Sequence, residues 1–320
     1  MLTRSLTATL ALLALPLGLG AAPALDFSTA QVEFNFTPGP NVGTNPVELR
    51  LDLTPGLTWT ETIEMNMNQD MSMAGMPAGM GAGTTQMTMV MSNTAGAGPT
   101  ENQRTITSRI NRADMSMNMG GQTMSMPADM LVGQESTMTV DANGRPADLE
   151  AALSGLFSAA GGGGGGAQGP MMNQMCVLPD QPVSVGDSWG MTVTFPNVPD
   201  ALMTMTNTLE SVDASGAEQT ARIRTATSLS IPTPVLLAIS QPGMPMPEVT
   251  IERMSMSGEG ESLHSVTTGR RGNGSQQFEM EMATAMPMPA MPQQAGQPAM
   301  PSNVTMSVTM SGTMQSTVTY

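Results

Sequence analysis

The sequence predicts an all-β protein, an antiparallel sheet curled into a half-barrel or open barrel with one short helix packed on its concave face. Three observations predict this fold: apolar and polar residues alternate in several segments, tight turns separate these segments, and one segment has helical spacing. Amphipathic strands must bury their apolar side against a second layer, so the helix is expected to cover the concave face. Residues 25–320 are expected to form a single domain.

The alternation is clearest between Trp59 and Met73. Odd positions carry Trp, Glu, Ile, Met, Met, Gln, Met and Met, while even positions are mostly Thr, Asn, Asp and Ser. Such a strand has one apolar side and one side in water, as in antiparallel sheets with a solvated face. The same alternation predicts further strands around residues 32–36, 47–53, 87–91 and 304–310.

Two turn sequences, Val140-Asp-Ala-Asn-Gly144 and Val212-Asp-Ala-Ser-Gly216, are nearly identical. Each predicts a tight reversal in which Asp or Asn caps the turn and glycine adopts a positive φ. Longer stretches are also similar, and we therefore expect two related β-meander halves. The similar pairs are residues 84–110 with 200–226, and residues 136–145 with 262–271.

One segment has the spacing of a helix. In residues 147–158, apolar positions fall at i, i+3, i+4 and i+7 from Leu149, and Pro146 suits the first turn. The helix is expected to end at a flexible glycine-rich loop over 159–169, because glycine loses much entropy in a helix. Dense proline predicts a second loop, rich in methionine, over 285–301, since proline cannot donate to a sheet.

The first 24 residues resemble a cleaved signal peptide. Arg4 precedes an apolar stretch that proline and glycine interrupt too early for a membrane span, and Ala22-Pro23-Ala24 suits a signal peptidase. We expect export to the periplasm or envelope of a bacterium, and no membrane span after cleavage. Loss of Arg4 takes the formal charge from −15 to about −16, which argues against nucleic acid or anionic lipid as a partner.

The segment Leu178-Pro-Asp-Gln-Pro-Val-Ser-Val-Gly-Asp-Ser-Trp189 carries a recognisable motif. It resembles an uncharacterised family of exported bacterial β-proteins with the pattern L-P-x-x-P-V-x-V-G-D-S-W. The resemblance implies an antiparallel sheet curled toward a half-barrel, loosely similar to periplasmic lipoprotein carriers, and it brings no catalytic residues. In physical terms, Gly186-Asp187 predicts a reversal and Trp189 begins a strand with a large apolar anchor.

Few residues suit catalysis. The single histidine, His264, lies in a strand-like segment and is expected to point outward or to be hydrogen bonded. The single cysteine, Cys176, has no basic neighbour to activate it. Glu259 and Glu261 alternate with apolar positions, which favours a solvated strand face. We therefore expect a non-catalytic binding or scaffold protein of the envelope, holding an apolar ligand or contacting an envelope protein.

Methionine is the unusual component, with 36 in the chain. Thioethers are soft ligands for Cu(I) or Ag(I), and strand residues two apart lie about 6.6 Å apart on one face. The alternatives are an oxidant sink, an adaptable apolar surface, or filling of an irregular core by residues such as Met65 and Met87. No other cofactor is expected. The candidate metal ligands are Met171, Met172, Met175, Cys176, Met65, Met67, Met71, Met73, Met76 and Met80.

Overall fold

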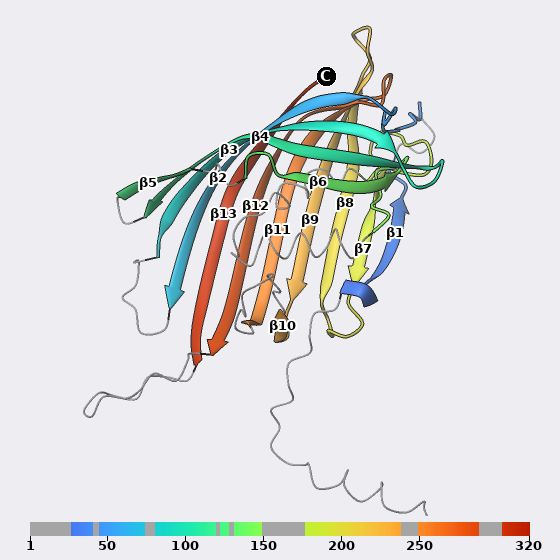
Figure 1. The fold of residues 1–320 in the computed structure, drawn as a ribbon. Helices are drawn as coiled ribbons and strands as arrows, with labels where there is room; N and C mark the ends of the chain where they lie inside the picture. The colour runs from blue at the N-terminus through green and yellow to red at the C-terminus, as the bar shows by residue number, and fades with distance from the viewer. Residues whose placement is uncertain are drawn as a thin grey trace, which may run out of the picture.

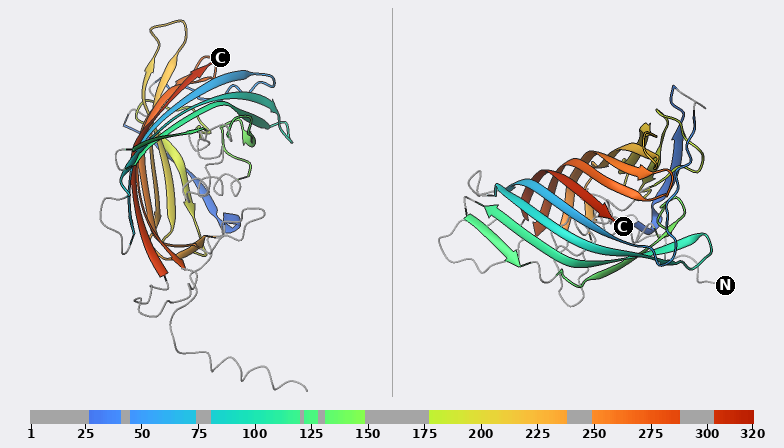
Figure 2. Two further views of the ribbon diagram at one scale, coloured as in Figure 1. Left: turned by 60° about the vertical axis from the view of Figure 1, so that its left-hand side comes forward. Right: turned by 90° about the horizontal axis from the view of Figure 1, so that it is seen from above.

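The protein forms one curved antiparallel sheet (Figures 1 and 2). The computed structural model describes residues 27–40, 45–73, 81–119, 122–127, 131–148, 177–237, 249–287 and 303–320. Its 13 strands follow the order β1-β7-β8-β9-β11-β12-β13-β2-β3-β4-β5, with β10 beside β11 and β6 beside β4. The ends of this path do not pair with each other, so the predicted all-β antiparallel sheet is confirmed and remains open.

Most strands arise from the segments in which apolar and polar residues alternate. A short 3-10 helix spans Phe27–Thr29. The strand bounds are β1 Gln31–Thr37, β2 Thr58–Met73, β3 Gly83–Ala97, β4 Gln103–Met119, β5 Gln122–Pro127, β6 Glu135–Asp141, β7 Ser188–Thr194, β8 Leu202–Asp213, β9 Thr220–Ile231, β10 Val235–Leu237, β11 Val249–Ser265, β12 Arg271–Pro287 and β13 Asn303–Thr319.

Two four-stranded meanders, β2-β3-β4-β6 and β7-β8-β9-β11, are built alike. A glycine with positive φ lies before the first strand of each, Gly56 at φ 92° and Gly186 at φ 98°. The Gly56 N–H donates to the Ala95 carbonyl, and the Gly186 N–H donates to the Leu209 carbonyl, each over 2.8 Å. These matching backbone contacts support the interpretation of two related halves.

The first strand of each meander carries a tryptophan opposite an asparagine of the second strand. The two sets, each completed by a hydroxyl of the third strand, are Trp59, Asn93 and Ser108, and Trp189, Asn207 and Thr225. In each set the asparagine Oδ1 accepts a hydrogen bond from the hydroxyl, at 2.6 Å in the first and 2.7 Å in the second. Both asparagines are buried, so their amide oxygens need these partners.

The last strand of each meander ends in a turn that contacts the other meander. We call residues 141–145 and 265–270 the closing turns; Gly144 and Gly269 have positive φ in them, at 77° and 73°. Leu178 N–H donates to the Asn143 carbonyl, and Asp52 N–H donates to the Gly269 carbonyl, each over 2.8 Å. Because Leu178 and Asp52 precede the first strands, each closing turn holds the entry segment of the opposite meander.

An arginine in each closing turn strengthens this contact. Each forms an ion pair and lies over an aromatic ring, and the two sets are Arg145 with Asp180 and Phe34, and Arg270 with Asp52 and Tyr320. The guanidinium carbon lies 4.1 Å from the ring centroid in the first set and 4.8 Å in the second. A cation over a ring face at this distance is attracted by the ring quadrupole.

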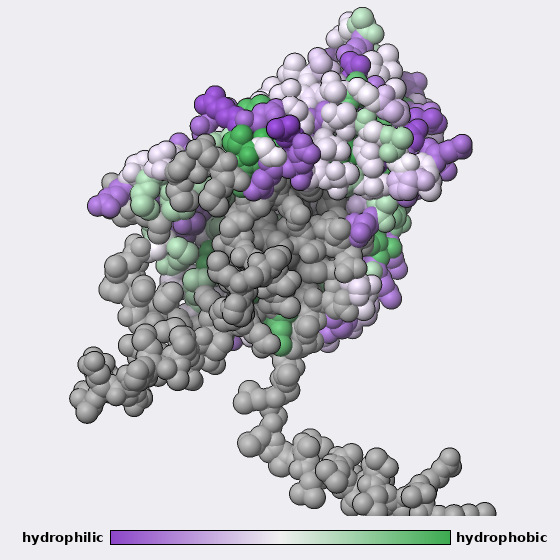
Figure 3. Space-filling model, viewed as in Figure 1, coloured by the Kyte–Doolittle hydropathy of each residue, from purple (hydrophilic) through white to green (hydrophobic). Residues whose placement is uncertain are grey.

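The two faces of the sheet differ in composition. The inner face carries buried apolar side chains, among them Ile63, Met89, Met203, Leu229 and Met280. The outer face carries mostly Thr, Ser, Asn, Gln and charged residues, which alternate with the inner positions along each strand. Polar and weakly polar side chains accordingly prevail on much of the described surface in Figure 3.

One predicted strand is wrong. Within residues 47–53 only Val47 makes a sheet contact, an isolated bridge to Val183 with N–O distances of 2.8 and 2.9 Å. Leu49 and Leu53 are nevertheless buried. The alternation in this segment therefore reflects burial of every second side chain, without a neighbouring strand to complete a ladder.

Two details of the predicted connections also need correction. Gly144 has the expected positive φ, but Gly216 does not, although Asp213 Oδ1 accepts the Ser215 N–H at 2.8 Å as a capping residue should. The loop predicted over 285–301 begins later, because β12 continues to Pro287 on its pairing with β13.

Several predictions fall outside the described residues. These are the signal peptide over 1–24, the loop over 159–169, and all but the first two residues of the helix over 147–158. Those two residues, Ala147 and Asp148, are not helical. In the described parts of the chain, no helix has the length and apolarity of a membrane span.

The motif that ends in Trp189 forms the predicted reversal, and Asp187 ties it to the N-terminal segment. Asp187 is buried, its Oδ1 accepts the Gly39 N–H at 2.6 Å, and its Oδ2 accepts the Ser184 N–H at 2.7 Å. The Trp189 ring is buried as well, and its Nε1–H donates to the Val177 carbonyl at 2.7 Å. The motif is therefore the entry turn of the second meander.

Replacing Asp187 with alanine is expected to lower the free energy of unfolding by about 2–4 kcal/mol, because two backbone N–H groups lose their acceptor. Asp187→Asn keeps one acceptor oxygen and should lose about half as much. Urea unfolding followed by tryptophan fluorescence measures both losses. Equal losses in the two variants would show that the carboxylate does not hold both N–H groups.

Candidate functional site

The inner face brings methionines from distant parts of the chain side by side. Met314 of β13 lies opposite Met65 of β2, Met65 lies opposite Met87 of β3, and Met87 lies opposite Met115 of β4. Directly opposite residues have Cβ atoms about 4.5–5.5 Å apart. We call these four residues the first methionine row. Met314 is 8% exposed, and the other three are half-buried.

A second methionine row crosses β11, β12 and β13. Met256 lies opposite Met280, and Met280 lies opposite Met310. Met280 is 5% exposed, while Met256 and Met310 are half-buried. On the other side of Met310 the neighbour is Gln69 of β2, where the row ends.

Phe278 separates the two rows and packs against glycine. It lies opposite Gly258 of β11 and Gly312 of β13. A Cβ at Gly312 would lie 2.9 Å from the Phe278 ring, so only glycine leaves room for the ring at this place. On β2, the strand on the other side of β13, Met67 lies opposite Gly312.

Four of the ten predicted metal ligands lie among the described residues. Met65, Met67 and Met71 share the inner face, as the alternation predicts, and each is half-buried. Met73 is described by its backbone alone, which pairs with Met306. Outside the described residues lie Met171, Met172, Met175, Cys176, Met76 and Met80.

The partners of Met65 could not be found from the sequence. Met87, Met115 and Met314 are separated from it by tens to hundreds of residues, and only strand register places them in one row. The one available signal was that each lies in its own alternating segment. Among the described residues, no group of three or more His, Cys, Asp or Glu side chains gathers as a metal site.

Several buried polar side chains interrupt the apolar inner face, and Glu61 and Ser316 are two of them. Glu61 is 1% exposed and Ser316 is 2% exposed. They lie on neighbouring strands but not directly opposite each other. Ser316 is opposite Ile63, which is two residues along β2 from Glu61. Within the described residues, Glu61 Oε1 and Ser316 Oγ have no hydrogen-bond partner. A buried polar atom without a partner costs free energy, so both are candidates to bind a polar group.

His264 is buried at the second closing turn. Its Nε2 lies 2.9 Å from the carbonyl oxygen of Arg50, and its Nδ1 has no partner among the described residues. Burial lowers the pKa of His264 to about 4, so the ring is neutral near pH 7 and Nε2–H donates to the carbonyl. The expectation of a hydrogen-bonded histidine is confirmed, and the ring supports the entry segment.

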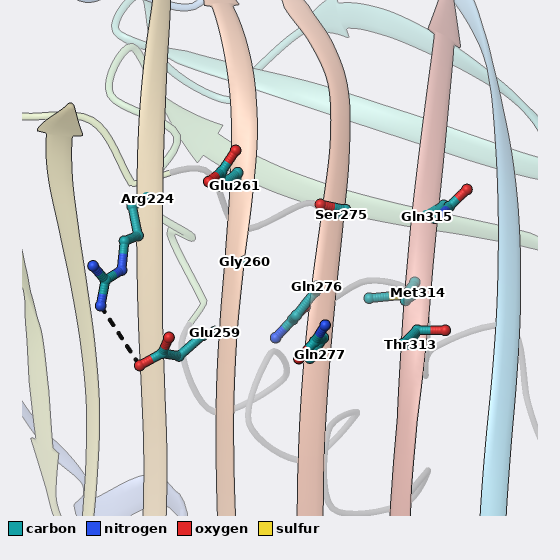
Figure 4. Close-up of a pocket in the computed structure, with 10 residues that line it drawn as sticks. All are labelled: Arg224, Glu259, Gly260, Glu261, Ser275, Gln276, Gln277, Thr313, Met314 and Gln315. Atoms are coloured by element: carbon teal, nitrogen blue, oxygen red, sulfur yellow. Dashed lines mark ion pairs between the residues drawn. The ribbon is translucent and has the colours of Figure 1, made fainter. Parts of the chain in front are cut away.

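The outer face has a shallow polar hollow of about 400 Å³, lined by residues of β9, β11, β12 and β13 (Figure 4). Arg224 lies 3.6 Å from Glu259 in it. Glu259 and Glu261 face Gln277 and Ser275 across the strands, and both are exposed. They therefore form part of a solvated face, as predicted, and exposed ion pairs of this kind contribute little stability.

Acidification should destabilise the protein through His264. The unfolded ring takes up a proton below its ordinary pKa of 6.5, whereas the folded ring resists protonation down to about 4. The contribution of His264 to the free energy of unfolding is therefore fully present above pH 6.5 and falls by about 3 kcal/mol as the pH drops to 4.

His264→Gln retains an N–H donor for the Arg50 carbonyl but does not titrate. Urea unfolding measures how much the free energy of unfolding falls between pH 7 and pH 4.5. This fall should be about 2–3 kcal/mol smaller in the variant than in the wild type. The same pH dependence in both proteins would show that His264 is not the titrating group.

No protein-family model matches the chain, and neither does any curated protein. Among solved structures, Pseudomonas aeruginosa OccK5 (OpdH) aligns with 82% of this chain and 97% of its own, at 9% identity and a TM-score of 0.17. The CymD monoaromatic hydrocarbon channel aligns with 83% of this chain and 89% of its own, at 10% identity and a TM-score of 0.12. These TM-scores are too low to support any conclusion about this protein.

Proposed function

We propose that the protein is a non-catalytic, exported binding protein of the cell envelope that holds an apolar or amphiphilic small molecule on its inner face. The observation that carries this proposal is a face of half-buried methionines on which Glu61 Oε1 and Ser316 Oγ are buried with no hydrogen-bond partner among the described residues. Ligand sites commonly combine a mainly apolar lining with a few polar groups that orient the ligand.

The apolar part of the site lies on β13, β2, β3 and β4. Met65, Met67, Met87, Met115 and Met117 are all half-buried on the inner face, so part of each side chain remains accessible. Methionine is unbranched and polarizable, and surfaces rich in it adapt to apolar partners of different shapes. The lining therefore suits an apolar body without strict shape selection.

The polar part lies along β2 and β13. Glu61 and Met65 are four residues apart on one face of β2, a distance of about 13 Å, and Met67 lies about 20 Å from Glu61. The Glu61 carboxylate accepts hydrogen bonds and favours a cation. These positions fit an elongated amphiphile, with an amine or hydroxyl at Glu61 and Ser316 and its chain over the methionines.

The non-catalytic part of the proposal rests on His264. This single imidazole is neutral and its Nε2–H donates to the Arg50 carbonyl, so it supports the entry segment. Export rests on the signal pattern over residues 1–24.

Binding of N-phenyl-1-naphthylamine, a fluorescent apolar amine, and its displacement by dodecylamine test the proposal. Met67→Gln should raise the Kd for both about fivefold, because a polar amide replaces part of the apolar lining. Met67→Leu is the matched control and should bind as the wild type does. Glu61→Gln should weaken dodecylamine more than the fluorescent probe.

Native mass spectrometry of protein purified from its own host provides a second measurement. A retained small molecule of amphiphilic mass is the expected result. A folded wild type that shows only its bare mass and binds neither probe would overturn the proposal.

A further inference from the structure

We propose that the two methionine rows of the inner face are binding sites for a soft monovalent ion, Cu(I) or Ag(I), each held by three thioether sulfurs. This inference is independent of the proposed binding of an apolar molecule. It rests on strand register, which places at least three methionines side by side in each row.

Thioether sulfur is a soft, neutral ligand that selects Cu(I) over harder ions. Across three adjacent strands the outer two Cβ atoms are about 10 Å apart, with the central one between them. A methionine side chain has three rotatable bonds, so the outer side chains can lean toward the central sulfur. Three sulfurs can then converge on one ion without movement of the backbone.

In the first row, Met65 is the central ligand. Met314 and Met65 pack in one apolar cluster with Met87, next to the buried Ile63. Met115 extends the row as a fourth, half-buried thioether. These surroundings favour a singly charged ion, because burial of a divalent ion among neutral sulfurs leaves more charge uncompensated.

In the second row, Met280 is the central ligand, with Met256 and Met310 on either side. Met310 and Met314 belong to the same strand and are four residues apart, about 13 Å. The rows therefore form two separate sites. The half-buried outer methionines of each row leave a route for an ion to enter.

Other described methionines of the sheet provide controls. Met203 lies between Val193 and Leu229, and Met138 lies opposite Ile106. Neither has a methionine directly opposite it. Replacing them with leucine removes two sulfurs and leaves both rows intact.

The test is titration of the reduced mature protein with Ag(I) by calorimetry, and with Cu(I) against a competing chelator. Relative to the wild type, Met65→Leu/Met87→Leu/Met314→Leu should bind one ion fewer, and so should Met256→Leu/Met280→Leu/Met310→Leu. Met138→Leu/Met203→Leu should bind as many ions as the wild type. The affinity of the ion that is lost with each row should change less than threefold between pH 7 and pH 5, because thioethers need no deprotonation.

Leucine keeps the volume and apolar character of methionine, so the variants should fold and should still bind the fluorescent apolar probe. The experiment therefore distinguishes loss of metal binding from loss of binding of the apolar molecule. Row variants that bind as many ions as the wild type, with equal affinity, would overturn the inference.

A measurement on the unsubstituted protein covers the case in which a row variant does not fold. Methionine 13C-methyl resonances of the wild type, assigned by single Met→Leu changes, should shift on addition of Ag(I) for Met65 and Met280. The resonances of Met138 and Met203 should stay in place. Unchanged Met65 and Met280 resonances at saturating Ag(I) would equally overturn the inference.

Discussion

The pairing of β13 with β2 is the contact on which the rest of the structure depends. These strands come from opposite ends of the chain and pair continuously from Met306 with Met73 to Thr319 with Thr60. The ladder joins the two meanders into one sheet and places Met314 beside Met65. Bringing such distant segments together costs loop-closure entropy, which the ladder and the burial of the inner face must offset.

The closing turns and the entry segments are held in place by polar groups that have hydrogen-bond or ion-pair partners. Asp187, His264 and the two turn arginines all bind backbone or oppositely charged groups. Glu61 Oε1 and Ser316 Oγ, equally buried, lack such partners among the described residues. His264 Nδ1 and the Nε atoms of Arg145 and Arg270 also lack a hydrogen-bond partner among the described residues, so Glu61 and Ser316 are assigned to ligand binding because they share the inner face with the half-buried methionines.

Methionine fills the role that aromatic residues have in many cores. The chain has only six phenylalanines and two tryptophans, and Phe278 lies on the inner face where Gly312 of the neighbouring strand leaves room for its ring. An unbranched thioether packs on such a curved, uneven face without strict fit. The same side chains therefore suit both an apolar molecule and a soft ion, and substitution by leucine separates the two because it removes only sulfur.

Features with a local cause could be predicted from the sequence, and features set by strand pairing could not. Strand alternation has a period of two residues, so the sequence by itself determined which side chains of Trp59–Met73 share a face, Glu61 included, and turn chemistry placed the reversals at Asp141 and Gly186. The same alternation misassigned residues 47–53, because burial of every second residue does not require a neighbouring strand.

Only the tertiary structure decided that Met65 lies between Met314 and Met87, and that Glu61 is buried without a described partner. Register between strands distant in sequence depends on the packing of the whole sheet, which no local pattern records.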